Sequence, residues 1–160
     1  MKSTTKIVAA VVGLAIAAPG FAIEVKKQVA VVATPAAAWA AIGDFCGIAA
    51  WHPAVESCAL SRQDGADLRS LTLKGGGGVI VEKLVRWDKA RRSYTYAILS
   101  GPLPVANYQS TIAVRQTKMG TVISWVGKFD AKGAPDDKAA AAIAGVYDGG
   151  LDSLKKKLAG

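Results

Sequence analysis

Residues 135–158, which read PDDKAAAAIAGVYDGGLDSLKKKL, have the pattern of a long helix. Its large apolar residues recur at intervals of three and four, which places them on one stripe of a helix: Ile143, Val146, Tyr147, Leu151, Leu154 and Leu158. Asp136 and Asp137 stand at the start and three lysines at the end, as the helix dipole favours. The sequence therefore predicts one long amphipathic helix that closes the chain.

The chain before this helix is rich in strand patterns. Seven segments alternate in hydropathy or concentrate β-branched and aromatic residues: residues 24–33, 55–62, 68–74, 79–87, 93–99, 107–115 and 121–130. Between the first two, Thr34-Pro35 starts a short helix that reaches Ile42, and residues 45–51 form a second one that Pro53 stops. A meander of strands followed by one long helix is an α+β arrangement.

Small residues occupy much of the long helix: Ala139, Ala140, Ala141, Ala142, Ala144, Gly145, Gly149 and Gly150. A curved sheet that folds around such a helix encloses a cavity, unless large side chains fill the space between them. The same small residues also permit close packing of helix against sheet. Both readings stay open on the sequence.

The first 22 residues have the pattern of a cleavable signal peptide. Two lysines precede an apolar run at residues 7–18, and Gly20-Phe21-Ala22 supplies the small residues that a signal peptidase accepts. The run is short for a membrane anchor, which needs about 20 apolar residues. We expect a periplasmic or secreted protein in which residues 23–160 form one domain, with no stable membrane insertion after cleavage.

The charge of the chain argues against a nucleic-acid partner. The formal net charge is +8, but the basic residues are scattered, and an exported chain rarely meets nucleic acid. The four glycines Gly75–Gly78 lack the lysine and the helix that follow in a phosphate-binding loop. We therefore expect no nucleotide or other cofactor.

Cys46 and Cys58 are the only cysteines, and in an oxidising compartment such a pair favours a disulfide. Two free buried thiols are the alternative. A structural zinc site is not expected, because two cysteines need histidine partners and the chain has one histidine.

Several segments resemble the START/Bet v 1-like helix-grip superfamily, also called SRPBCC. The resemblance covers the chain from Val25 to Leu158, and its most telling segments are residues 38–45, Trp51-His52-Pro53, residues 81–84, residues 107–110 and residues 146–151. It implies a helix-grip fold, in which a curved antiparallel seven-stranded sheet surrounds the C-terminal helix and two short helices follow the first strand.

Within this superfamily, the pattern is similar to the branch of plant abscisic acid receptors and bacterial polyketide cyclase/dehydratase-like proteins. By this resemblance, residues 74–78 and 100–106 correspond to two loops that close over the ligand. The lid residues would be Gly75, Gly76, Gly77, Gly78, Pro102, Leu103 and Pro104. The receptors lack the glycine run and have a basic residue where this chain has Leu103-Pro104, so the resemblance does not extend to hormone recognition.

The same resemblance implies ligand-binding positions: His52, Glu82, Asn107, Tyr108 and Ser110. Tyr96 and Trp125 join them as side chains with an apolar body and a polar tip on strands that face the helix. Each has a plainer reading. His52 could cap or pack at the end of the second short helix, Glu82 could point outward beside Arg69, and the aromatic residues could be ordinary core.

We expect an exported protein that binds a small apolar or amphipathic molecule in its cavity. The first alternative is a cyclase or dehydratase that uses His52 and Glu82 as an acid–base pair. The second is a periplasmic accessory protein that acts on an exported oxidoreductase, because exported members of the superfamily include accessory proteins of methanol oxidation.

Overall fold

The computed structural model describes residues 23–160, so the expected signal peptide at residues 1–22 lies outside the described part. The sheet consists of β1 (Ile23–Val31), β2 (Val55–Gln63), β3 (Ala66–Leu73), β4 (Val79–Asp88), β5 (Ser93–Ser100), β6 (Val105–Thr117) and β7 (Gly120–Ala131). The helices are α1 (Pro35–Ile42) and α2 (Asp136–Leu158). Two short 3₁₀ turns, η1 (Gly47–Ala50) and η2 (Lys74–Gly76), complete the list.

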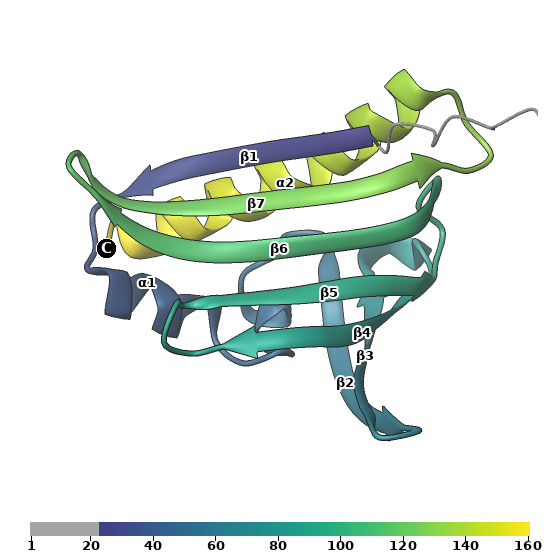
Figure 1. Ribbon diagram of the computed structural model, residues 1–160, viewed down its shortest axis with the longest axis horizontal. Coiled ribbons are helices and arrows are strands. Elements are labelled where there is room, and N and C mark those ends of the chain that lie inside the picture. Colours follow the sequence, from purple (N-terminus) through teal and green to yellow (C-terminus); the bar gives the residue numbers. More distant parts are fainter. Residues whose placement is uncertain (1–22) are drawn as a thin grey trace, which may run out of the picture.

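The seven strands form one antiparallel sheet in the order β1-β7-β6-β5-β4-β3-β2. The sheet curves, and α2 lies across it against β1 and β7 (Figure 1). This confirms the helix-grip fold that the sequence predicted. The second short helix differs in type, because η1 is a single 3₁₀ turn rather than an α-helix.

The start of α1 and the segment after it are fixed locally. The Thr34 side chain accepts a hydrogen bond from the Ala37 amide and caps α1, and Pro35 takes the first helical position. Cys46, just before η1, is joined to Cys58 of β2 by a disulfide. The disulfide therefore holds the η1 segment against the edge of the sheet.

The small residues of α2 serve close packing at Gly150. A side-chain carbon added there would lie 2.7 Å from Cδ2 of His52 and 2.8 Å from Cζ3 of Trp125. The neighbouring buried side chains are large, among them Trp51, Trp125 and Tyr147. At this part of the helix the close-packing reading holds, and no space remains for a ligand.

No helix in residues 23–160 is both long enough and apolar enough to cross a membrane.

Candidate functional site

A cavity of about 80 Å³ that is partly open to solvent lies between the sheet and α2, beside η1. Its walls are mostly apolar side chains. The lining residues are Ile48, His52, Ala54, Val55, Leu71, Leu73, Ile80, Glu82, Tyr96, Ile98, Leu103, Tyr108, Trp125, Ile143 and Val146. Five of the seven predicted ligand-binding residues are therefore brought together around one space: His52, Glu82, Tyr96, Tyr108 and Trp125.

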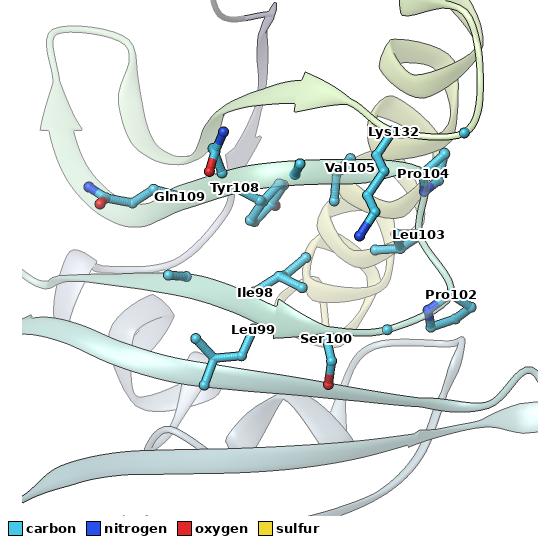
Figure 2. A pocket seen from close by; sticks show the side chains of 15 residues that line it. Ile98, Leu99, Ser100, Pro102, Leu103, Pro104, Val105, Tyr108, Gln109 and Lys132 are labelled. Atoms are coloured by element: carbon cyan, nitrogen blue, oxygen red, sulfur yellow. The ribbon is translucent and has the colours of Figure 1, made fainter. Parts of the chain in front are cut away.

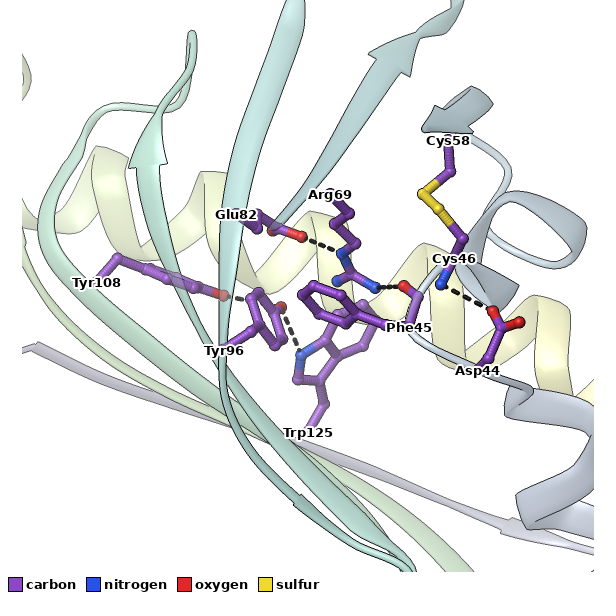
Figure 3. Close-up of polar contacts among 9 residues, drawn as sticks. All are labelled: Asp44, Phe45, Cys46, Cys58, Arg69, Glu82, Tyr96, Tyr108 and Trp125. Atoms are coloured by element: carbon purple, nitrogen blue, oxygen red, sulfur yellow. Dashed lines mark hydrogen bonds and ion pairs between the residues drawn. A yellow bond between two sulfur atoms is a disulfide. The ribbon is translucent and has the colours of Figure 1, made fainter. Parts of the chain in front are cut away.

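Glu82 points inward and is almost completely buried. Its Oε2 accepts a hydrogen bond from Nε of Arg69 at 2.5 Å, and the Arg69 side chain is fully removed from solvent (Figure 3). Burial raises the pKa of the Glu82 carboxyl, and the adjacent Arg69 guanidinium opposes that shift. Glu82 therefore points inward and is also paired with Arg69. The strand register places the two residues opposite each other on β3 and β4, and both side chains are buried.

Arg69 is held from several sides. Its Nη1 donates to the Phe45 carbonyl, and its guanidinium carbon lies 4.2 Å from the centre of the Phe45 ring and 5.0 Å from that of Tyr96. Its Nη2 and the nearby hydroxyl of Tyr94 have no hydrogen-bond partner within residues 23–160. Aromatic faces stabilise the cation in place of water.

A chain of hydrogen bonds runs through the buried hydroxyl groups beside the cavity. Its two ends fix its direction, because the Trp125 indole can only donate and the Val126 carbonyl can only accept. Trp125 Nε1 donates to the Tyr96 hydroxyl at 3.1 Å, and the Tyr96 hydroxyl lies 3.4 Å from that of Tyr108. Tyr108 donates to Tyr147 at 2.5 Å, and Tyr147 donates to Ser110 at 2.8 Å. Ser110 donates to the Val126 carbonyl at 2.9 Å.

The contact between Tyr96 and Tyr108 is the weak member of this chain. At 3.4 Å it is longer than the usual 2.5–3.0 Å between hydroxyl oxygens, while the next contact is short. Both tyrosines line the cavity. Burial raises the pKa of each well above that of an exposed phenol, so both hydroxyls remain protonated at neutral pH and can donate.

His52 lies at the cavity wall with both ring nitrogens engaged by the backbone. Nε2 lies 3.0 Å from the Val146 carbonyl of α2, and Nδ1 accepts from the Ala54 amide at 3.2 Å. This arrangement requires the neutral ring with its proton on Nε2. Burial also lowers the pKa of His52, so the ring is neutral at pH 7. The geometry favours the packing reading, in which His52 joins the end of η1 to α2.

The two remaining predicted ligand residues lie outside the cavity wall. Ser110 is buried, but its hydroxyl is used by Tyr147 and the Val126 carbonyl. Asn107 is exposed and has a left-handed backbone conformation (φ 51°), and its Nδ2 donates to Asp130 at 2.7 Å. It lies in a bulge of β6 and is not among the residues that line the cavity.

The two predicted lid loops meet at the open end of the sheet. A side-chain carbon on Gly78 would lie 3.7 Å from Pro102, so the glycine loop and the β5–β6 loop are in contact range. The four glycines are exposed, whereas Leu103 is half-buried and reaches the cavity. Of the seven predicted lid residues, Leu103 is the one that lines the cavity.

Two residues of this region were not singled out as functional by sequence reasoning. Arg69 appeared only as an outward partner for Glu82, and Tyr147 only as part of the apolar stripe of α2. The only feature of the sequence that could have indicated a role for Arg69 was the acidic residue Glu82 on the neighbouring strand. The packing of α2 against the sheet brings Tyr147 between Tyr108 and Ser110, and the local sequence pattern does not indicate this contact.

The fold agrees with the comparisons with known proteins. The family model for polyketide cyclase/dehydrase and lipid transport proteins matches residues 22–159, and the chain belongs to that family. No curated protein matches the chain.

Solved structures share the fold closely. A Bacillus cereus protein called XoxI is 29% identical, with a TM-score of 0.79 over 85% of this chain and 95% of its own. An uncharacterised Bacillus thuringiensis protein is 27% identical, with a TM-score of 0.78 over 86% of this chain and all of its own. The Streptomyces aromatase/cyclase Zhui is 18% identical, with a TM-score of 0.68 over 86% and 94%, and at that identity it supports the fold alone.

Proposed function

We propose that this protein is exported and binds a small apolar or amphipathic molecule in the cavity between the sheet and α2. The observation that carries the proposal is the composition of the cavity wall, which is apolar except for a few side chains with hydrogen-bonding groups. This is the usual make-up of a small-molecule site. Membership of a family described as polyketide cyclase/dehydrase and lipid transport is in keeping with it.

Glu82 and Tyr96 are the groups with capacity for a ligand. The Oε2 atom of Glu82 accepts from Arg69, and none of the side-chain hydrogen bonds found in residues 23–160 uses its Oε1 atom. The Tyr96 hydroxyl makes only the long contact to Tyr108 with its hydrogen. A ligand hydroxyl could therefore donate to Glu82, and a ligand oxygen could accept from Tyr96.

The volume of the cavity limits what it holds as it stands. About 80 Å³ is below the roughly 300–1,000 Å³ of typical ligand sites. A larger molecule requires the two loops to separate, and Leu103 is the side chain that would have to move. The exposed glycines of the neighbouring loop leave room for that movement.

The geometry favours binding over acid–base catalysis. A cyclase that used His52 would need a free ring nitrogen near the substrate. Both ring nitrogens are bonded to the backbone instead. His52 would have to break its contact with α2 before it could transfer a proton.

The disulfide supports export. Cys46 and Cys58 are bridged, and disulfides persist in oxidising compartments outside the cytoplasm. We expect the protein isolated from its host to lack residues 1–22 and to resist thiol alkylation until it is reduced. Intact-mass measurement checks both points, and a full-length mass with two free thiols would contradict export.

Native mass spectrometry tests the binding proposal directly. The protein purified from its own compartment should carry a retained small molecule that is released on denaturation. Leu73→Phe, which enlarges a half-buried side chain of the cavity wall, should lose it, and Val85→Phe on the exposed outer face of β4 should keep it. Equal retention by both variants, or none by the wild type, would contradict the proposal.

A further inference from the structure

The sheet has an opening between β5 and β6. Paired residues run from Ser93–Ala113 to Ala97–Gln109, and beyond Ala97 no further residues of the two strands are paired. A bulge between Ala106 and Gln109 bends β6 away at this point. Figure 2 shows the two strands diverging toward the loop that joins them. We call this opening, bounded by residues 97–109 with Lys132 and Gly133, the β5–β6 groove.

The groove and the cavity share a wall. The groove holds about 890 Å³, and three of its residues also line the cavity: Ile98, Leu103 and Tyr108. The outer space and the inner space therefore adjoin each other at these three side chains. A displacement of half-buried Leu103 would join them into one site of ordinary ligand size.

The charges of the two spaces differ. Lys132 is the one charged side chain among the residues that line the groove, and it extends across the opening toward Leu103 (Figure 2). It forms no salt bridge within residues 23–160. The nearest acidic residue along the chain, Asp130, accepts a hydrogen bond from Asn107 instead. The groove thus offers an unpaired cation beside an apolar entrance.

We propose that the β5–β6 groove is the mouth of the binding site and that the ligand is a single-chain amphiphile with an anionic head group. The head group lies at Lys132, and the apolar chain passes Leu103 to reach the cavity. This inference rests on the proposed function and names its ligand class. A neutral apolar molecule would use the same entrance without the contribution of Lys132.

Octanoate and 1-octanol form a matched pair of probes, because they share a chain and differ in the charge of the head. The Trp125 indole N–H reports on the cavity, since it donates to Tyr96 at the cavity wall. Its ¹⁵N–¹H signal is followed during titration at pH 7.5 and low salt. We expect both probes to shift this signal in a saturable way, and added salt to weaken octanoate alone.

Charge-reversal variants test the anionic head group separately from binding in the cavity. Lys132→Glu should weaken octanoate by about fivefold or more and leave octanol unchanged. Lys118→Glu, in the turn at the opposite end of β6, has the same change of charge and should alter neither. If both probes bind the wild type and Lys132→Glu leaves octanoate unaffected, the ligand class is wrong and the proposed function stands. If neither probe shifts Trp125, the proposed function fails and this inference with it.

The entrance has its own variant. Leu103→Trp places a larger side chain between groove and cavity and should weaken both probes together. Unchanged binding of both in Leu103→Trp would contradict entry past this residue, and near-ultraviolet circular dichroism checks that the variant is folded.

Discussion

Arg69 and Glu82 form an ion pair inside the protein, with 2.5 Å between Nε and Oε2 and both side chains almost entirely removed from solvent. The pair lies on adjacent strands, and its acidic member reaches the cavity wall. An ion pair in such a place is costly to bury and more costly to break. It therefore links the stability of the fold to the chemistry of the candidate site.

Loss of one member of the pair should destabilise the protein strongly. Glu82→Gln leaves the Arg69 cation buried without a counter-charge, which costs ~3 kcal/mol of unfolding free energy. The double variant Arg69→Met/Glu82→Leu should recover most of that loss, because apolar side chains need no partner. Urea denaturation of the three proteins checks this. A double variant that is no more stable than Glu82→Gln would contradict the account.

Two glycines of α2 should respond in opposite ways to alanine. Gly150→Ala places a methyl group against His52, Trp125 and Trp51, and should cost ~1–3 kcal/mol despite the better helix propensity of alanine. Gly145→Ala points into open space and should gain up to ~1 kcal/mol. Thermal unfolding measures both, and a stabilised Gly150→Ala variant would show that the packing at this point is loose.

Tyr147 and Gly127 should be energetically coupled. The Tyr147 hydroxyl occupies the position that a side-chain carbon on Gly127 would take. Gly127→Ala should therefore be strongly destabilising in the wild type and better tolerated in Tyr147→Phe, where the hydroxyl is absent. Tyr147→Phe alone should cost ~1–3 kcal/mol, because Tyr108 loses its acceptor and Ser110 its donor. A double-mutant cycle with purely additive effects would contradict this coupling.

His52 should make stability depend on pH. Burial, with smaller contributions from Arg69 and Lys74, lowers its folded-state pKa below the usual 6.5. The unfolded chain therefore binds the proton more readily, and the stabilising effect of the neutral ring is present above pH 6.5 and lost as the pH falls below it. The slope is at most about 1.4 kcal/mol per pH unit.

His52→Gln removes this titration and serves as the control. Between pH 7.5 and 5.5 the unfolding free energy of the wild type should fall relative to that of His52→Gln, and the comparison cancels the titration of Glu82, which both proteins share. Because His52 is the only histidine in the chain, a difference between the two proteins that does not change with pH would show that its pKa is not lowered on folding.

The sequence predicted all seven strands and α2, because their patterns are long and local. It left the direction of Glu82 open because residues 79–85 are apolar on both alternating faces, with Ile80 and Val81 as neighbours. Only pairing with Arg69 on β3 settles the direction. The hydrogen bond between His52 and the Val146 carbonyl was equally unpredictable, since Val146 lies 94 residues away on α2.

The small residues of α2 did not show whether a cavity lies beside the helix. The answer depends on large side chains from other elements that pack against it. Gly150 packs against tryptophan and histidine, and the remaining space lies farther along, beneath β3 and β4. The opening between β5 and β6 was likewise not predictable, because it arises where a bulge at Asn107 ends the pairing of two otherwise regular strands.

The cavity should receive a small apolar molecule, and the indole N–H signals of the four tryptophans report whether it does. On addition of 1-octanol, the Trp125 signal should shift in a saturable way, while the signals of Trp39 and Trp87 at the α1 end stay unchanged. The shift should disappear in Leu73→Phe and persist in Val85→Phe. A Trp125 signal that never moves, or that moves equally in both variants, would contradict the account.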